Sequence, residues 1–579
     1  MLESLAQTSV QPSVQPFGPV LRRSAANTAI HRQQVHLPVE LKDRVISRLK
    51  AMREQRWVSR LWAGDATLWT GTDEDQWTGW VNPAQQQAIM RRYLGMCARL
   101  RDGLYEHAVL IGMGGASLGA QVLQSALGSS PGGLKLHVLD SIDPDQVQAL
   151  ERRLPLDKCL YIVASKSGTT MESTLLARHF YQRARAALGE SAGRHFCAIT
   201  DLDTPLQKMA EELGYAAVFT GDSQIGGRYS VLSPFGLVPL ALMGHDPMAY
   251  LNQASVARNQ CGPRAPMDKN PGAILGAVLG EAALSGRDKV TIWTDPKLAC
   301  FGDWLEQLIA ESTGKHGRGL IPVTQEPETE VHRYPSDRLF VILRRGPAMK
   351  RQTEQLRAAG HAVIDIEVGE GALLAQEFYR WQFATAVAGS ILEINPFDQP
   401  DVEASKVRTR QVLAAPIVQP AGVSLGSLVV DIGEHADLGD WLRAHPADYF
   451  SLLAYLPSND DTRAWLTHWQ GRLRNMYGAA ATSGYGPRYL HASGQLHKGG
   501  PAGGSYLFIG RHDCHGNELG RCQSAQAQAD IAELRARGRH CAAVWFTGSV
   551  ATGLRDLAQL LESALGVDAP VESNAALAH

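Results

Sequence analysis

The sequence predicts an α/β protein with parallel sheets covered by helices, and two observations support this. Short apolar runs alternate with helical stretches, at His107–Gly112, Leu136–Asp140, Leu160–Ser165, His195–Thr200 and Ala216–Thr220. After a polar break near residues 261–271 the alternation restarts, at Lys289–Asp295, Leu320–Thr324, Leu339–Arg344 and His361–Val368. Strands that alternate with helices are typical of parallel sheets. We therefore expect two successive α/β domains, over residues 101–262 and 263–425.

The regions on either side of these domains have different patterns. Residues 1–35 are rich in Gln, Ser, Pro and Ala without a period, which predicts a flexible arm. Residues 36–100 have a mostly helical pattern, and residues 426–579 predict a mixed α/β region. In that last region we expect helices at Leu438–Tyr455 and Asp461–Met476, and strands at Ser505–Ile509 and Cys541–Phe546. We expect a frayed tail from about Val567.

Composition excludes several classes of function. Of the 579 residues 44% are hydrophobic, and the net charge of −2 argues against nucleic-acid or membrane-surface partners. The N-terminus has no signal-peptide pattern, and the longest apolar stretch, Phe235–Met243, is too short to span a bilayer. The eight cysteines are scattered without a CxxC pair, as expected for free thiols in the cytoplasm. We expect no metal, because His512–His515 lacks a second ligand pair.

A strand-to-helix turn carries the clearest chemical signal, and its donors are Ser165, Lys166, Ser167, Thr169 and Thr170. The first N–H groups of the following helix lack partners and lie at the positive end of its dipole, so they favour an anion. Because Lys166 is the only cation, the turn predicts a compact phosphate monoester. The alternative is an ordinary Ser/Thr-rich N-cap, but four hydroxyls exceed what one cap needs.

Two glycine-containing segments accompany this turn. Residues 112–119 include Gly114 and Gly115, which let the backbone approach a ligand closely. Their spacing does not fit a dinucleotide fingerprint, and no P-loop lysine follows. In the second segment, residues 226–230, Gly227 precedes Arg228, whose guanidinium would stabilise negative charge on a ligand. The alternative for that segment is a glycine turn with a surface arginine.

Two further segments carry candidate acid–base groups. Residues 303–315 predict a helix on which Gln307 and Glu311 share a face, although such a glutamate is often only solvated. Residues 393–406 contain Asn-Pro and Gln-Pro, which predict a rigid turn into a helix with Gln399 before Lys406.

In this order the five segments resemble the phosphoglucose isomerase family over about residues 95–415. The segment 484–501 is more similar to the isomerase half of bifunctional transaldolase–glucose-6-phosphate isomerases. The first ~95 residues cannot hold a transaldolase barrel. The resemblance implies two sugar-isomerase (SIS-type) domains with doubly wound parallel sheets, and a homodimer with the active site at its interface. It also implies cofactor-free interconversion of glucose 6-phosphate and fructose 6-phosphate in the cytoplasm.

The resemblance also implies roles for single residues. It assigns the phosphate to the turn, and further substrate contacts to Gln307, Gln399, Gly114, Gly115 and Gly227. It implies that Glu311 moves a proton between C2 and C1 through a cis-enediol and that Arg228 steadies the enediolate. Lys406 matches the lysine that opens the sugar ring. His332, which lies 332 − 311 = 21 residues past Glu311, is the candidate for the histidine that the family takes from the partner subunit.

Some features depart from the family pattern. Ala116 stands where many members have serine, with Ser117 beside it. His491, His497 and Lys498 lie either in a loop over the active site or in a packed connector, and we interpret the segment as a connector. The alternative function is a catalytically silent sugar-phosphate-binding regulator, against which the retained acid–base residues argue. A second alternative function is that of an isomerase that also accepts mannose 6-phosphate.

Overall fold

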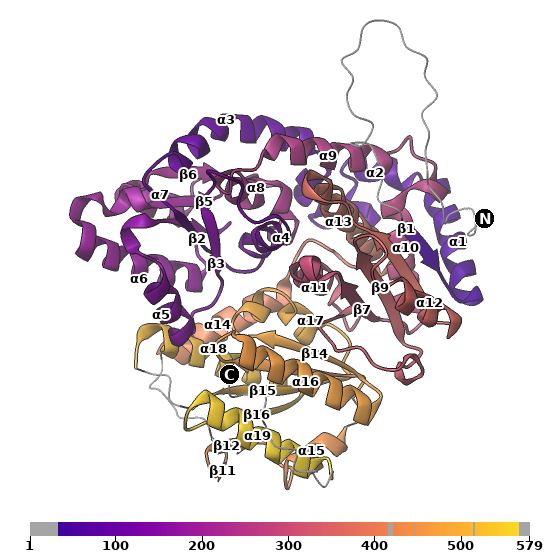
Figure 1. Ribbon diagram of the computed structural model, residues 1–579. Helices are drawn as coiled ribbons and strands as arrows, with labels where there is room; N and C mark the ends of the chain where they lie inside the picture. The colour runs from indigo at the N-terminus through magenta and orange to yellow at the C-terminus, as the bar shows by residue number, and fades with distance from the viewer. Residues whose placement is uncertain (1–32, 415–420, 446, 513–515, 567–579) are drawn as a thin grey trace, which may run out of the picture. The chain divides into compact units, whose positions relative to one another are not determined.

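A computed structural model describes residues 33–414, 421–445, 447–512 and 516–566 (Figure 1). The chain divides into two compact units, and each unit is built from stretches that are separate in the sequence. The first unit holds the described residues up to Ser141, together with Val147–Val402 and Leu490–Pro501. The second unit holds Ile142–Gln146, Glu403–Tyr489 and the described residues from Ala502 onward.

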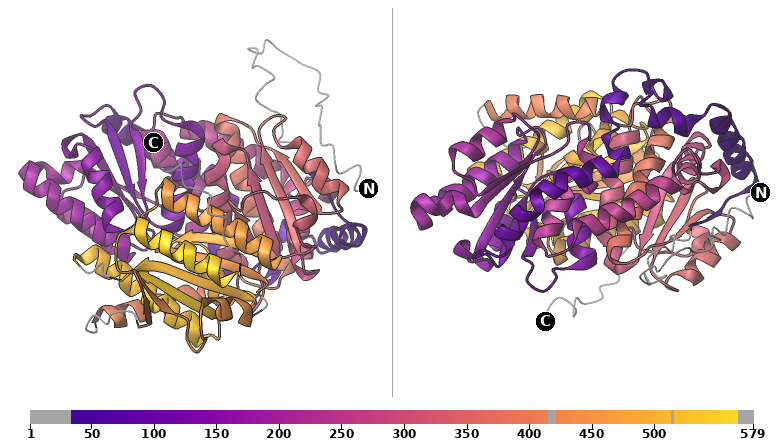
Figure 2. Two further views of the ribbon diagram at one scale, coloured as in Figure 1. Left: turned by 60° about the horizontal axis from the view of Figure 1, so that its bottom comes forward. Right: turned by 90° about the horizontal axis from the view of Figure 1, so that it is seen from above.

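The first sheet of the first unit is entirely parallel, in the order β3-β2-β4-β5-β6. Its strands are β2 (His107–Ile111), β3 (Lys135–Leu139), β4 (Cys159–Ala164), β5 (Phe196–Thr200) and β6 (Ala217–Thr220). Helices cover both faces (Figures 1 and 2): α5 (Pro144–Arg153), α6 (Met171–Leu188) and α7 (Pro205–Glu212) on one, α3 (Pro83–Arg101), α4 (Leu118–Leu127) and α8 (Pro234–Leu242) on the other. All six residues of β4 are buried, as expected for a central parallel strand whose sequence is one apolar run.

The second sheet has the order β1-β10-β9-β7-β8, and all its strands but one are parallel. Its strands are β1 (Gln33–His36), β7 (Lys289–Thr294), β8 (Ile321–Thr324), β9 (Arg338–Arg344) and β10 (Ala362–Glu367). Helices of this half are α10 (Pro271–Leu284), α11 (Ala299–Thr313), α12 (Lys350–Ala358) and α13 (Leu374–Ile391). Helices α10 and α13 pack so closely that a Cβ on Gly276 would lie 2.5 Å from the Ala384 carbonyl oxygen.

The antiparallel strand β1 corrects one sequence prediction. Residues 1–32 lie outside the described residues, but Gln33–Val35, predicted as part of a flexible arm, belong to β1 and pair with β10. Gln33 and Val35 are buried and alternate with less buried neighbours, so the segment covers the sheet edge. A four-residue strand of mixed polarity is too short to show a period in the sequence.

The segment between β1 and β2 is mostly helical, with α1 (Val39–Glu54), α2 (Trp57–Trp62), α3 and short 3-10 turns. Helix α9 (Pro247–Gln260) packs with α3 and α13. Among the residues that the structure describes, no helix has the length and apolar character to cross a membrane.

The second unit is built on a third, mixed sheet, in the order β11-β12-β16-β15-β13-β14. Its strands are β11 (Val423–Leu425), β12 (Leu428–Asp431), β13 (Tyr449–Tyr455), β14 (Ala480–Tyr485), β15 (Gly504–Arg511) and β16 (His540–Phe546). Its helices are α15 (Leu438–Ala444), α16 (Asp460–Tyr477), α18 (Glu518–Ala536) and α19 (Val550–Ala564). Helix α14 (Pro400–Ala414) runs from the first unit into the second, and α17 (Gly494–Gly499) belongs to the first.

The predicted helix Leu438–Tyr455 is wrong in its second half, which forms the fully buried strand β13. A short, uniformly apolar run fits a buried strand and a buried helix equally well, so its period does not distinguish them. The predicted tail from Val567 lies outside the described residues.

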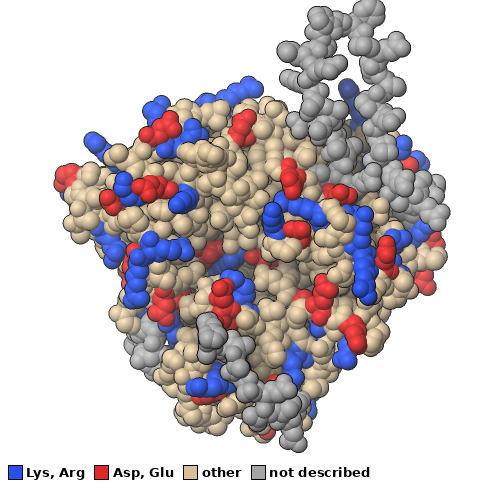
Figure 3. Space-filling model, in the orientation of Figure 1, with Lys and Arg blue, Asp and Glu red and all other residues tan. Residues whose placement is uncertain are grey.

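The observed sheets confirm the predicted α/β class with helix-covered parallel sheets. On the face that Figure 3 shows, acidic and basic side chains are interspersed, in line with the net charge of −2.

Candidate functional site

Two of the predicted loops follow neighbouring strands of the first sheet. Ile111 of β2 pairs with Val163 of β4, and the loops 112–117 and 165–170 begin just after these residues. The strand order reverses between β2 and β4, since β3 lies on one side and β5 and β6 on the other. Ligands of open α/β sheets bind at such a reversal, outside the carboxyl ends of the strands. The structure thus brings the glycine-rich loop and the predicted phosphate turn to one place.

The turn 165–170 is ordered by its own hydroxyl groups. Ser165 Oγ lies 2.9 Å from Thr170 Oγ1, and Ser167 Oγ lies 2.9 Å from Thr169 Oγ1. Gly168 has a φ of +67°, which favours glycine, and α6 begins directly after the turn. These contacts hold the hydroxyls at the N-terminal end of a long helix, where an anion is favoured.

The cation of this turn has a partner that the sequence did not indicate. The Lys166 ammonium group donates to the carboxylate of Asp201, which directly follows β5. Burial raises the pKa of Asp201, while the adjacent Lys166 lowers it. Lys166 is therefore fixed beside the turn before any ligand binds.

Arg228 is buried and not a surface arginine, since only 2% of its side chain is exposed. Its guanidinium donates to Ser312 Oγ (2.9 Å), to Gln399 Oε1 (3.0 Å) and to the carbonyl oxygens of Pro396 (3.0 Å) and Asp398 (2.7 Å). The structure thus joins the Gly-Gly-Arg segment to the Asn-Pro-Phe-Asp-Gln-Pro turn. Five donors in a rigid fork suit a guanidinium to this task better than an ammonium group.

Glu311 lies beside this guanidinium. Its Oε1 is 3.1 Å from Arg228 Nη1, and Gln307 Nε2 donates to its Oε2 at 3.1 Å. Gln307 and Glu311 share one face of α11, as their spacing predicts. With 12% of its side chain exposed, Glu311 is the more accessible member of the pair. A reachable carboxylate next to a fixed cation is suited to moving a proton while a negative charge develops.

Lys315 is a second buried cation, and it contacts the turn that holds Arg228. The sequence prediction gave it no role. Lys315 Nζ is 2.8 Å from Asp398 Oδ1 and donates to the Ser312 carbonyl oxygen at 3.1 Å. Burial and the nearby Arg228 lower the pKa of Lys315 to about 7, although Asp398 opposes this shift. Lys315 thus joins the end of α11 to the turn that holds Arg228.

Comparisons with known proteins show the family to which the chain belongs. A family model described as phosphoglucose isomerase matches residues 100–321. A glucose-6-phosphate isomerase of Thermus thermophilus is 31% identical over 386 residues, which are 58% of this chain and 90% of that protein. The chain belongs to the phosphoglucose isomerase family. A glucose-6-phosphate isomerase of Parabacteroides distasonis is 28% identical over 363 residues, or 54% of this chain and 81% of that protein.

Solved structures show the same fold for this phosphoglucose isomerase family member. A hypothetical protein of Thermus thermophilus superposes with a TM-score of 0.57 and 25% identity, covering 66% of this chain and all of that chain. A glucose-6-phosphate isomerase from Chlamydia trachomatis reaches a TM-score of 0.50 at 20% identity, with 57% of this chain and 73% of that chain covered. The two predicted sheets thus share their fold with these solved structures.

Two predicted residues of the isomerase lie apart from the contacts described so far. His332 lies on a short turn with 76% of its side chain exposed, and its ion-pair partner is Glu330, at 3.5 Å. Lys406 belongs to the second unit, where its Nζ lies 2.6 Å from Glu403 Oε1. Their roles remain predictions.

Ser117, the residue beside Ala116, has a partner within the glycine-rich loop. Ser117 is fully buried, and its hydroxyl donates to the carbonyl oxygen of Gly114 at 3.2 Å. It therefore stabilises the glycine-rich loop from within.

The segment Leu490–Pro501 is packed, as a connector would be, and also touches isomerase residues. Gln307 Nε2 donates to the His491 carbonyl oxygen at 2.7 Å, and His491 Nε2 lies 2.8 Å from Glu172 Oε1. His497 and Lys498 are buried in α17. Sequence reasoning did not single out Glu172 or the contact with Gln307.

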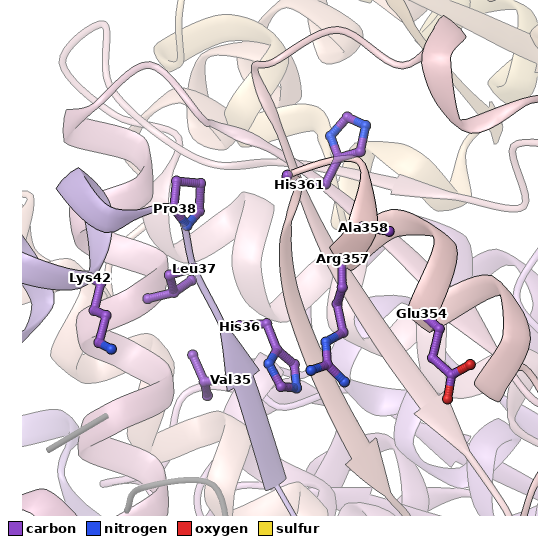
Figure 4. A pocket seen from close by; sticks show the side chains of 10 residues that line it. Val35, His36, Leu37, Pro38, Lys42, Glu354, Arg357, Ala358 and His361 are labelled. Carbon is purple, nitrogen blue, oxygen red and sulfur yellow. The ribbon is translucent and has the colours of Figure 1, made fainter. Parts of the chain in front are cut away.

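A cavity of about 890 Å³ lies elsewhere in the first unit, between the start of α1 and α12 (Figure 4). Its lining includes His36, Lys42, Glu354, Arg357 and His361. Burial and the adjacent Arg357 lower the pKa of His36. None of the predicted substrate-binding residues lines this cavity.

Proposed function

We propose that this phosphoglucose isomerase family member interconverts glucose 6-phosphate and fructose 6-phosphate, by moving a proton between C2 and C1 through a cis-enediol. The pair of the buried Arg228 and the partly exposed Glu311, with 3.1 Å between Nη1 and Oε1, carries this proposal. A C–H bond next to a carbonyl is only weakly acidic, so its base needs a nearby cation to stabilise the enediolate. A positioned base of this kind contributes about 10²- to 10⁴-fold to the rate.

The phosphate turn would hold the other end of the sugar. Its donors Ser165, Lys166, Ser167, Thr169 and Thr170 surround the N-terminal end of α6, which supports their assignment to the substrate phosphate. Fixing the phosphate lowers the entropy cost of bringing C1 and C2 to Glu311.

The remaining residue roles are assigned for the same substrate orientation, with the phosphate at the turn and C1 and C2 at Glu311. Gln307 and Gln399 contact Glu311 and Arg228, which supports their placement along the sugar. The backbone would approach the sugar closely at Gly114, Gly115 and Gly227. Lys406 is proposed for ring opening, as is His332 from the partner subunit of a homodimer. We place the reaction in the cytoplasm and assign no cofactor.

A coupled assay tests the activity: the purified chain receives fructose 6-phosphate, and glucose 6-phosphate is detected through its NADP-dependent oxidation. We expect turnover. Binding of fructose 6-phosphate without turnover would contradict the proposal and support a regulator.

A further inference from the structure

The cavity between the start of α1 and α12 has the size of a small-molecule site (Figure 4). Its volume is about 890 Å³, and binding sites for small ligands usually measure about 300–1,000 Å³. One wall comes from β1 and the turn into α1, and the other comes from α12 and the turn after it. The predicted substrate-binding residues all lie elsewhere, so a molecule in this cavity would bind apart from the sugar phosphate.

Two cations of the lining have no counter-ion among the residues that the structure describes. Lys42 extends from α1 and Arg357 from α12, and neither side chain forms an ion pair with those residues. Glu354, the acid among the described lining residues, lies one turn before Arg357 on the same helix but does not pair with it. The lining thus has two positive charges and one negative charge, which favours an anionic ligand.

His36 adds a buried nitrogen atom that has no partner. Its Nε2 is covered, and no described residue forms a hydrogen bond with it. Burial and the nearby Arg357 lower the pKa of this imidazole, so the ring is neutral at pH 7 and has one hydrogen bond to donate. A buried polar atom without a partner costs free energy, which an accepting oxygen of a ligand would recover. Arg357 is exposed, so its long side chain is free to turn and admit that oxygen beside Nε2.

A phosphate monoester fits these groups better than a carboxylate does. At pH 7 a phosphate monoester carries a charge of about −1.5 to −2 and has three terminal oxygen atoms. It can therefore accept hydrogen bonds from Arg357, His36 and Lys42 together, whereas a carboxylate has one charge and two oxygen atoms. Val35 and Leu37 supply apolar surface for the rest of the molecule.

We propose that this cavity is a second anion site, which binds an organic phosphate whose apolar part packs against Val35 and Leu37. The phosphate would join Lys42 of α1 to Arg357 of α12, and so tie the segment before β2 to the second sheet. A ligand that binds only the folded protein stabilises it by mass action, so the melting temperature should rise with ligand concentration. The inference does not rest on the proposed function, because no residue of this cavity is assigned a role in the isomerisation.

Calorimetric titration of the full chain with phenyl phosphate tests the site, because this probe joins a phosphate to an apolar ring. We expect binding. Arg357→Gln and Lys42→Gln should each weaken it about tenfold or more, since each removes a hydrogen bond to a charged group. Arg351→Gln is the matched control and should leave binding unchanged, because Arg351 is exposed on the same helix and does not line the cavity.

The same titrations in the Lys166→Ala variant separate this cavity from the phosphate turn of the proposed function. Lys166→Ala weakens any binding of the probe at that turn. Binding that persists in Lys166→Ala and is lost when Arg357→Gln is added belongs to the cavity. Binding that is lost in Lys166→Ala and kept in Arg357→Gln would overturn the inference.

Benzoate tests the class of anion without any variant, so a substitution that prevented folding would not decide the outcome. It has the same ring with a single negative charge, and it should bind at least ~10-fold more weakly than phenyl phosphate. Equal binding of benzoate, no binding of phenyl phosphate, or an equal loss in Arg351→Gln would each refute the second anion site. Failure of the chain to isomerise fructose 6-phosphate would refute the proposed function and leave this inference standing.

Discussion

The backbone of Gly115 lies directly against that of Gly227, so closely that a Cβ on Gly115 would be 2.0 Å from the Gly227 carbonyl oxygen. This contact joins the loop after β2 to the residue that precedes Arg228. The position of the guanidinium therefore depends on a residue without a side chain more than a hundred positions earlier.

Gly115→Ala should disturb this contact. The overlap involves backbone and not a flexible side chain, so the loop has to move, at a cost of about 1–3 kcal/mol in the free energy of unfolding. Turnover should fall as well, because Arg228 moves with its segment. Urea denaturation and the coupled assay measure the two effects. Gly226→Ala is the control, since a Cβ there meets nothing within 4 Å; equal behaviour of both variants would refute the argument.

Glu311→Gln should abolish most of the turnover and leave binding largely intact. An amide cannot accept the proton from carbon, so kcat should fall by at least ~10²-fold. Arg228 keeps its bonds to Ser312 and Gln399, and fructose 6-phosphate should bind within a few-fold of its usual affinity by calorimetry. Glu190→Gln, at an exposed glutamate, is the matched control. Normal turnover in Glu311→Gln would remove this residue as the base.

Lys166→Ala should raise the Michaelis constant more than it lowers kcat. A hydrogen bond to a charged group is worth about 1.5–3 kcal/mol, or about a 10- to 10²-fold change in affinity. The loss also leaves the Asp201 carboxylate near the phosphate without its counter-ion. Steady-state kinetics measures both constants, with the half-buried Lys158 as the control position. An unchanged Michaelis constant would exclude Lys166 from the phosphate site.

Lys315 should make stability rise with pH above neutrality. Its pKa is lowered from 10.5 to about 7 in the folded protein, so between these values the unfolded chain binds more protons. The free energy of unfolding then increases with pH, by at most about 1.4 kcal/mol per pH unit.

Lys315→Met should remove this rise while roughly keeping the side-chain volume. Urea denaturation between pH 7.5 and 8.5 compares the two proteins, and the difference between them cancels titration of the buried thiols, whose pKa values burial raises. Parallel curves would contradict the prediction.

The sequence predicted the parallel strands of the first two sheets to within one or two residues, because each is a short apolar run between helical segments. It did not predict β1, whose pairing with β10 joins residues more than 300 positions apart. It misread β13 because a short buried run has no distinguishing period.

The sequence predicted those parts of the candidate site whose residues lie close together along the chain. The spacing of Gln307 and Glu311 placed both side chains on one face of a helix. The contacts of Lys166 with Asp201 and of His491 with Glu172 join positions 35 and 319 residues apart. Only folding brings such partners together, and no short motif records them.

The division of the chain into six segments that alternate between the two units has a consequence for biosynthesis. The first unit cannot close when the ribosome has passed residue 402, because the piece that contacts Gln307 is encoded almost ninety codons later. Until that stretch emerges, the nascent protein exposes the end of α11 where Leu496 will pack. Separate expression of the chain up to the end of α14 would therefore yield an incomplete first unit.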